Sequence, residues 1–205
     1  MTIVKLYYKI KVRLQDIFFK RAENIPTYEV KRSTLNKFRE EFNLKILIET
    51  GTFMGETVEY FKNDFSHIYS IELSIDLANQ AKEKFLNDDH ISIIQGDSGE
   101  ILKGLLAKID QPVLFWLDGH YSSEFWVGDV FIKTARTNVD TPIVEELKTI
   151  LEHPFDHVIL IDDARMFTGN TDYPSIFQIE RMVRNSNRKY SVKVENDIIR
   201  IIPNK

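Results

Sequence analysis

Short apolar runs alternate with amphipathic stretches along most of the chain. Strand-like runs lie at 45–50, 67–72, 91–95, 113–118 and 157–162, and helix-like stretches between them lie at 56–63, 75–87, 98–108 and 142–153. The runs Leu114-Phe115-Trp116-Leu117 and Val158-Ile159-Leu160-Ile161 are apolar throughout, which is typical of strands covered on both faces. This order predicts an α/β fold built from βα units around a mostly parallel sheet.

The two ends of the chain depart from this alternation. A helix at about 175–186 leads into the runs 190–194 and 198–202, which predict an antiparallel β-hairpin after the five parallel strands. In residues 3–21, apolar positions recur every three to four residues among basic ones and predict an amphipathic helix. This helix can pack on its own domain or on a partner subunit, or it can lie on an anionic membrane surface. Ser33 and Thr34 are predicted to cap a short helix that ends near residue 42.

Composition and charge narrow the class of protein. The chain has 205 residues, 43% hydrophobic and 28% charged, which fits one soluble domain. The lack of cysteine excludes disulfides, thiolate metal sites and cysteine nucleophiles. No apolar run approaches the ~20 residues of a membrane span, and no signal-peptide core is present, so a cytoplasmic location is expected. Residues 1–45 carry +6, which leaves −10 for the rest, and this acidic body argues against a nucleic-acid partner.

The turn after the first strand carries the most informative motif. Its strand ends in Glu49-Thr50, and Gly51-Thr52-Phe53-Met54-Gly55 follows before the next helix. Glycines here permit close backbone approach, and such a turn builds a nucleotide-sized crevice. Glu72 closes the second strand 21 residues after Gly51, a spacing at which an acid can hold ribose hydroxyls. By itself, the glycine pattern has a plain strand-to-helix turn as its alternative explanation.

Polar residues also end the other predicted strands. The third strand is followed by Asp97 and Ser98, the fourth by Asp118, and the fifth by Asp162 and Asp163. Because ligands bind beyond the carboxyl ends of parallel strands, these residues predict a functional cleft at one edge of the sheet. Taken singly, Ser98 and Asp163 are also explained as helix caps.

Three of these acids predict a metal site. Asp118, Asp162 and Asp163 would repel one another at neutral pH, and a hard cation such as Mg²⁺ would relieve that repulsion. The alternative is that one of the adjacent aspartates caps a helix or pairs with Arg165. His120, two residues beyond Asp118, is a candidate general base, with a hydrogen-bonded structural role as the alternative.

Over roughly residues 45–202 the chain resembles the S-adenosylmethionine (SAM)-dependent methyltransferases of the Rossmann-like class. The resemblance rests on the Glu49–Gly55 turn, Glu72, Gly96-Asp97-Ser98 and the closing hairpin, and it implies a seven-stranded sheet. It divides the chain into a helical segment, 1–44, and a methyltransferase domain, 45–205. It also implies which residues contact SAM: near the methionine part Glu49, Thr50, Gly51, Thr52, Phe53 and Gly55; at the ribose Glu72; and near adenine Asp97 and Ser98.

More narrowly, the acids resemble those of Mg²⁺-dependent O-methyltransferases that act on catechols or on natural-product sugars. This resemblance implies that Asp118, Asp162 and Asp163 bind Mg²⁺ and that His120 is the base. The sequence departs from the family in lacking the middle glycine of the turn and in having an unusual loop at 121–141. Candidate substrate contacts are Tyr121, Trp126 and Arg165, with further aromatic side chains at Phe125 and Phe131.

The expected function is therefore O-methylation of a sugar, a glycan or a small hydroxylated metabolite, in polysaccharide or natural-product biosynthesis. Three alternatives stay open: a nicotinamide-dependent oxidoreductase, a nucleic-acid methyltransferase, and a cofactor-binding domain without turnover. The sequence lacks the Asn/Asp-Pro-Pro-Tyr/Phe motif and the cysteine that nucleic-acid methyltransferases use. A homodimer, and peripheral membrane contact through residues 3–21, are further expectations.

Overall fold

The structure is a computed structural model, and it describes residues 25–119, 124–127, 130–133 and 141–204. For 124–127 and 130–133 it describes the backbone alone. The predicted helix at 3–21 lies outside the described residues. Among the described residues, no helix has the length and hydropathy that crossing a membrane requires.

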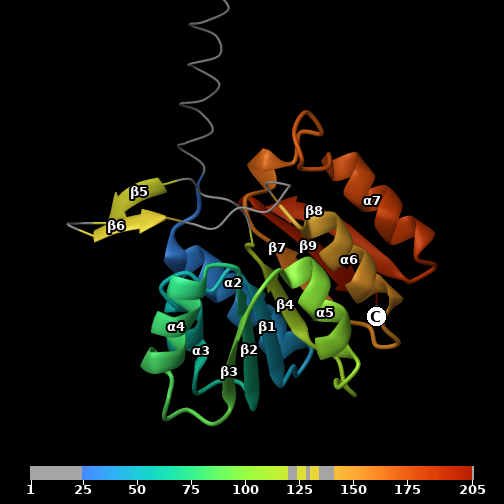
Figure 1. Cartoon of the computed structure of the whole chain (residues 1–205). Helices are drawn as coiled ribbons and strands as arrows, with labels where there is room; N and C mark the ends of the chain where they lie inside the picture. Colours follow the sequence, from blue (N-terminus) through green and yellow to red (C-terminus); the bar gives the residue numbers. More distant parts are fainter. Residues whose placement is uncertain (1–24, 120–123, 128–129, 134–140, 205) are drawn as a thin grey trace, which may run out of the picture.

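A seven-stranded sheet forms the centre of the molecule, in the order β3-β2-β1-β4-β7-β9-β8 (Figure 1). The five parallel strands are β1 (Ile46–Thr50), β2 (His67–Glu72), β3 (Ile91–Gln95), β4 (Leu114–Leu117) and β7 (Val158–Ile161). The closing hairpin is β8 (Tyr190–Glu195) and β9 (Ile198–Pro203), and β9 runs antiparallel to β7. The predicted fold class, with its parallel strands and terminal hairpin, is confirmed.

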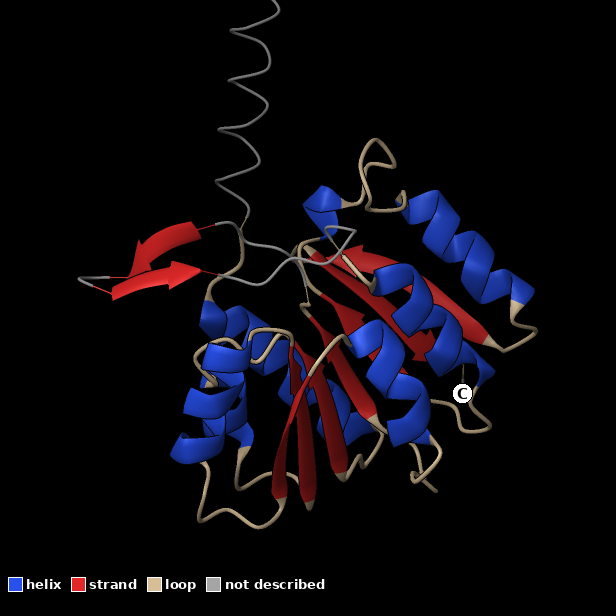
Figure 2. Cartoon of the chain, in the orientation of Figure 1, coloured by secondary structure: helices blue, strands red, loops and turns tan. Residues whose placement is uncertain are grey.

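Helices cover both faces of this sheet (Figure 2). The helices are α2 (Tyr28–Glu41), α3 (Glu56–Phe61), α4 (Ile75–Lys84), α5 (Ser98–Leu106), α6 (Ile143–Glu152), the 3₁₀ turn η1 (Ala164–Met166) and α7 (Ile176–Asn185). Buried side chains of α5, α6 and α7 belong to one core cluster and those of α2 and α3 to a second. The sheet therefore separates two hydrophobic cores.

Alternation along each central strand supplies both cores. In β4, Phe115 and Leu117 join the core with α5, α6 and α7, whereas Leu114 and Trp116 join the core with α2 and α3. Successive side chains of a strand point to opposite faces, so a strand buried on both sides must be apolar at every position. This explains why the run from Leu114 to Leu117 shows no polar alternation.

The start of α2 corrects a sequence prediction. Ser33 and Thr34 do not cap the helix; Thr27 does, and its side chain accepts a hydrogen bond from the Val30 N–H. Thr34 lies inside the helix and donates its hydroxyl to the Val30 carbonyl at 2.8 Å. Because Ser and Thr can bond back to the preceding turn, their side chains are compatible with a helix interior as well as with its start.

The segment after β4 also differs from the prediction of a long loop at 121–141. Within it, β5 (Glu124–Val127) and β6 (Val130–Lys133) pair antiparallel as a separate two-stranded sheet. The aromatic residues here were predicted to be loop contacts for a substrate, and the strand pairing was not predicted. Aromatic and β-branched residues are enriched in strands, and their abundance in EFWV and VFIK was the available signal.

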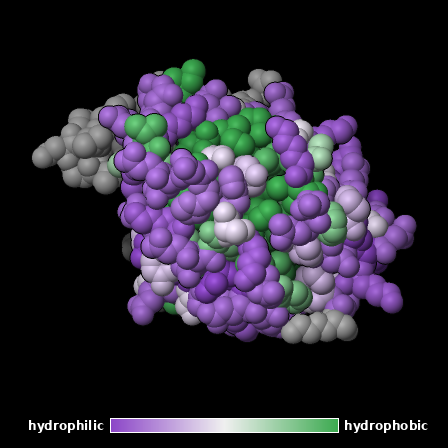
Figure 3. Space-filling view, turned by 90° about the horizontal axis from the view of Figure 1, so that it is seen from below, coloured by the Kyte–Doolittle hydropathy of each residue, from purple (hydrophilic) through white to green (hydrophobic). Residues whose placement is uncertain are grey.

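The lower edge of the sheet, where the parallel strands begin, carries a pair of histidines, of which His157 is buried and His153 half-buried. The Val113 N–H donates to His157 Nδ1 at 3.0 Å, so Nε2 of His157 carries the proton and donates to His153 Nδ1 at 2.8 Å. His153 in turn donates through Nε2 to the Leu106 carbonyl. Burial lowers the pKa of His157 to about 3, so its ring is a neutral link in the fold. Figure 3 views this edge from below and shows apolar side chains at its centre, ringed by polar ones.

Candidate active site

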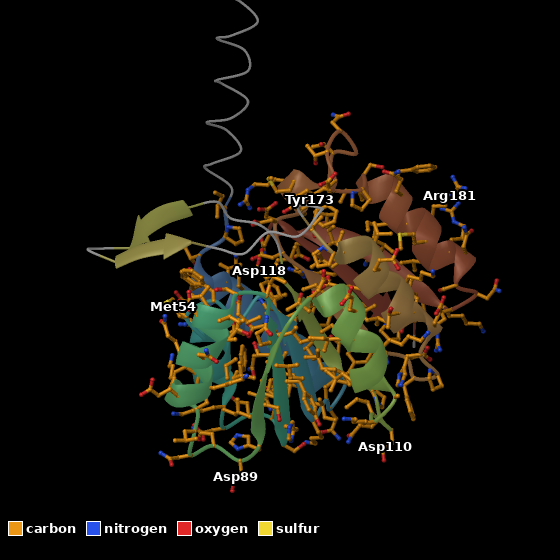
Figure 4. The ribbon with its side chains drawn as sticks, viewed as in Figure 1. Met54, Asp89, Asp110, Asp118, Tyr173 and Arg181 are labelled. Carbon is orange, nitrogen blue, oxygen red and sulfur yellow. The ribbon has the colours of Figure 1, made fainter. Side chains whose placement is uncertain are left out.

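The glycine turn after β1 brings two strand ends into contact. Gly51 has φ +86°, and a Cβ added there would lie 2.6 Å from the carbonyl oxygen of Asp118, at the end of β4. Its N–H donates to the Ile71 carbonyl at 2.9 Å, which ties the turn to β2. In Figure 4, Met54 of this turn and Asp118 lie toward the upper edge of the sheet, opposite Asp89 and Asp110. Only glycine fits Gly51's conformation and this close approach together.

Glu72 holds the same turn from the end of β2. Its Oε2 accepts the Phe53 N–H at 2.9 Å, and its Oε1 accepts the Ser74 N–H at 2.8 Å. The first of these bonds restrains Phe53, a non-glycine residue with φ 49°. The carboxylate is thus fixed in place, and each oxygen retains a lone pair for a ligand hydroxyl. The predicted role of Glu72 in ribose binding stays a prediction.

A buried hydrogen-bond chain lies beneath the turn. Ser70 donates its hydroxyl to Glu49 Oε2 at 2.6 Å and receives the Thr52 hydroxyl at 2.7 Å. Burial raises the pKa of Glu49 to about 8, against the opposing effect of the Ser70 hydrogen bond. Glu49 is therefore predominantly protonated at neutral pH and supports the turn as a neutral group.

Asp97 and Ser98 start α5 at the end of β3. The Asp97 side chain caps the helix by accepting the Gly99 N–H at 2.9 Å. Ser98 is buried, and its hydroxyl donates to Glu146 Oε1 at 2.5 Å. The local roles of these two residues are therefore structural, and their predicted place near adenine stays a prediction.

Glu146, which was not among the residues predicted from the sequence, also lies at the candidate site. It lies on α6 with 1% of its surface exposed, and its Oε1 would be 3.5 Å from a Cβ added at Gly119, directly after Asp118. Burial raises its pKa to about 7. A signal was present, because Glu146 shares the apolar stripe of α6 with Ile143, Leu147 and Ile150, where a charged residue is out of place.

Replacing Glu146 by glutamine is expected to change how stability depends on pH. The carboxyl has a pKa of about 7 when folded and an ordinary value of 4.5. Its stabilising contribution is therefore complete below pH 4.5 and falls by about 1.4 kcal/mol per pH unit as the pH rises to 7. Glutamine cannot titrate, so the variant should gain about 3 kcal/mol relative to wild type across this range.

Urea unfolding of both proteins at several pH values measures this difference, in which the other titrating groups cancel. Glu145→Gln is the matched control, because Glu145 is the neighbouring residue and is exposed. The control should follow the wild-type pH profile. A difference between Glu146→Gln and wild type that is the same at every pH would contradict the assigned pKa.

The acids after β4 and β7 are met by two cations. The Lys31 ammonium, on α2, is bonded to Asp162 Oδ2, and Asp162 Oδ1 accepts the Asp163 N–H at 2.8 Å. Arg165 pairs with Asp163 at 2.6 Å and also with Asp197. Among the described residues, no three His, Cys, Asp or Glu side chains are placed to share a metal ion. The pairing of Asp163 with Arg165 was the alternative left open by the sequence. The pairing of Lys31 with Asp162 was not predicted.

A pocket opens beside Lys31, between α2, α3 and the end of β4. Its lining combines polar and apolar side chains and consists of Tyr28, Lys31, Arg32, Leu35, Glu56, Thr57, Phe61, Trp116 and Asp118. The predicted base His120 and the predicted substrate contact Tyr121 lie outside the described residues. Trp126 lies in β5, and its side chain is likewise outside them.

Comparison with solved structures identifies the fold. The O-methyltransferase TomG from Streptomyces achromogenes, in complex with SAM, has a TM-score of 0.59 at 12% identity, covering 88% of this chain and 82% of that chain. An O-methyltransferase from Bacillus cereus in complex with SAH has a TM-score of 0.56 at 14% identity, covering 91% of this chain and 88% of that chain. The SAH-bound methyltransferase PaMTH1 from Podospora anserina has a TM-score of 0.55 at 15% identity, covering 90% of this chain and 82% of that chain. No protein-family model matches the chain, and no curated protein matches it in sequence. The likeness confirms the predicted Rossmann-like methyltransferase fold.

Proposed function

We propose that the protein is a SAM-dependent O-methyltransferase that acts on a hydroxyl group of a sugar, a glycan or a small hydroxylated metabolite. The close approach of Gly51 to the Asp118 carbonyl is the main support for this proposal, because it joins the glycine turn after β1 to the acid at the end of β4. Solved structures of the same fold include O-methyltransferases in complex with SAM and SAH. The pocket beside Asp118 offers an acceptor a place next to this junction.

In the proposed complex, the methionine part of SAM lies along the turn from Glu49 to Gly55. The ribose hydroxyls meet Glu72, whose carboxylate is already held by two backbone N–H groups. The adenine lies near Asp97 and Ser98. A neutral Glu49 suits this arrangement, because it adds no negative charge close to the carboxylate of the cofactor.

Methyl transfer is an in-line displacement at the carbon attached to the sulfonium. The bond from the acceptor oxygen to this carbon forms as the sulfur–carbon bond breaks, and SAM becomes the neutral thioether SAH. The acceptor loses one proton, for which Asp118, in the lining of the pocket, is a candidate and His120 the predicted base. The protein contributes by aligning the donor with the acceptor and by removing this proton.

Magnesium, predicted at Asp118, Asp162 and Asp163, does not fit the side chains as they are arranged. Both oxygens of Asp162 are engaged, by Lys31 and by the Asp163 N–H, and Asp163 is paired with Arg165. A divalent ion bound to Asp162 would have to displace Lys31. The proposed mechanism therefore includes no metal ion. Arg165 is better placed to balance the charge of Asp163 and Asp197 than to bind a substrate.

Calorimetric titration of the purified protein with SAM and SAH tests the proposal. We expect micromolar binding of both compounds and no binding of NAD⁺ under the same conditions. A screen of sugars and catechols with labelled SAM then identifies the acceptor class. Binding of NAD⁺ without SAH binding would establish the oxidoreductase alternative, and binding of none of these compounds would refute the proposal. Homodimer formation, cytoplasmic location and membrane contact through residues 3–21 stay predictions.

A further inference from the structure

The acids after β4 and β7 surround a cation that the chain itself supplies. Lys31 lies one turn into α2, and its ammonium is bonded to Asp162, whose side chain is 1% exposed. The same ammonium lies 6.0 Å from the centre of the Trp116 ring and is close enough to Asp118 and Asp163 to be attracted by both. One lysine thus faces all three carboxylates that the sequence assigned to a metal.

The position of the Lys31 ammonium relieves the electrostatic repulsion between the acids. A buried carboxylate is costly unless a positive charge compensates it, and adjacent carboxylates increase that cost. An ammonium provides one charge and three N–H donors on a flexible stem, whereas Mg²⁺ needs several oxygen ligands at close to octahedral geometry. With the Lys31 ammonium on Oδ2, a divalent ion bound to Asp162 would lie against a positive charge unless it displaced the lysine.

We propose that Lys31 takes the place of a divalent cation in this site and excludes one, so that removing its side chain allows Asp162 and the neighbouring acids to turn toward a divalent ion and bind it. The consequence for catalysis, which rests on the proposed function, is methyl transfer that does not need a metal. Lys31 also lines the pocket beside Asp118, so its ammonium is the cation next to an acceptor bound there.

Binding of Mn²⁺, measured by electron paramagnetic resonance, tests the proposal on the full chain. Wild type should show no saturable binding below the millimolar range. Lys31→Met should bind Mn²⁺ at least about 10-fold more tightly than wild type, and adding Asp162→Asn should abolish the gain. Lys31→Arg keeps the charge and should bind no better than wild type. Lys37→Met, a loss of the same charge at an exposed position of α2, is the matched control and should also behave as wild type.

Saturable Mn²⁺ binding by wild type that disappears in Asp162→Asn would overturn the proposal, and this comparison does not require Lys31→Met to fold. Folded Lys31→Met that binds no more Mn²⁺ than wild type would also overturn it, since a lysine that merely tethers α2 predicts no gain. Turnover of wild type should be unchanged by EDTA. SAH titration on the same samples separates the two proposals, because absent SAH binding refutes the proposed function and leaves the Mn²⁺ result intact.

Discussion

Replacing Glu72 by alanine is expected to weaken SAH binding by at least about 100-fold, the equivalent of one to two hydrogen bonds to a charged group. The carboxylate of Glu72 accepts the N–H groups of Phe53 and Ser74, so it sets the shape of the cofactor turn as well as facing the proposed ribose. Alanine removes both effects at once. Calorimetric titration with SAH measures the loss. The SAH affinity of Glu72→Gln should lie between those of wild type and Glu72→Ala, because an amide retains one acceptor oxygen and puts an N–H₂ group against the other backbone donor.

Glu83→Ala is the matched control for Glu72→Ala. Glu83 lies on α4, is exposed, and its replacement changes the net charge by the same amount. Its SAH affinity should equal that of wild type. Thermal unfolding of both variants shows whether they fold. A folded Glu72→Ala protein with wild-type affinity for SAH would remove Glu72 from the cofactor site.

Replacing Gly51 by alanine is expected to destabilise the protein by about 2–4 kcal/mol and to abolish SAH binding. One part of the cost is conformational, because φ +86° places a Cβ in the left-handed region, at roughly 1–2 kcal/mol. The other part is steric, because the new Cβ would lie 2.6 Å from the carbonyl oxygen of Asp118 and would force β4 and the turn apart. Chemical denaturation measures the loss of stability, and calorimetric titration measures the loss of SAH binding.

Gly104→Ala separates these effects from a general sensitivity to losing glycine. Gly104 lies in α5, and a Cβ added there would meet no atom within 4 Å. Alanine at this position should stabilise the helix by about 0.5–1 kcal/mol and leave SAH binding unchanged. Equal stability and equal SAH affinity of Gly51→Ala and Gly104→Ala would show that the close approach to Asp118 is not needed for cofactor binding.

The sheet could be predicted because its strands are covered on both faces. A run such as Val158-Ile159-Leu160-Ile161 must be apolar at every position, and it alternates with amphipathic helices whose order implies parallel pairing. The start of α2 could not be predicted in the same way. Thr27, Ser33 and Thr34 are all competent caps, and only the packing of Leu35 and Phe38 into the core shows which turn is helical.

The position of the site was predictable for a topological reason, whereas its charge pairing was not. Parallel strands end at one edge, so the covalent order alone gathers Glu49, Glu72 and Asp118 there. Glu146 and Lys31 come from helices, whose rotation and depth depend on packing. Lys31 meets Asp162 across 131 residues of sequence, and no local pattern marks such a contact.

The sequence by itself thus determined the α/β order, the glycine turn and the row of acids at the strand ends, because periodicity and chain order are local properties. Only the tertiary structure decided which cation those acids hold. A divalent ion and an ammonium both relieve the repulsion of three carboxylates, and the choice between them rests on whether a side chain can reach the site. The packing of α2 against the sheet brings Lys31 within that reach.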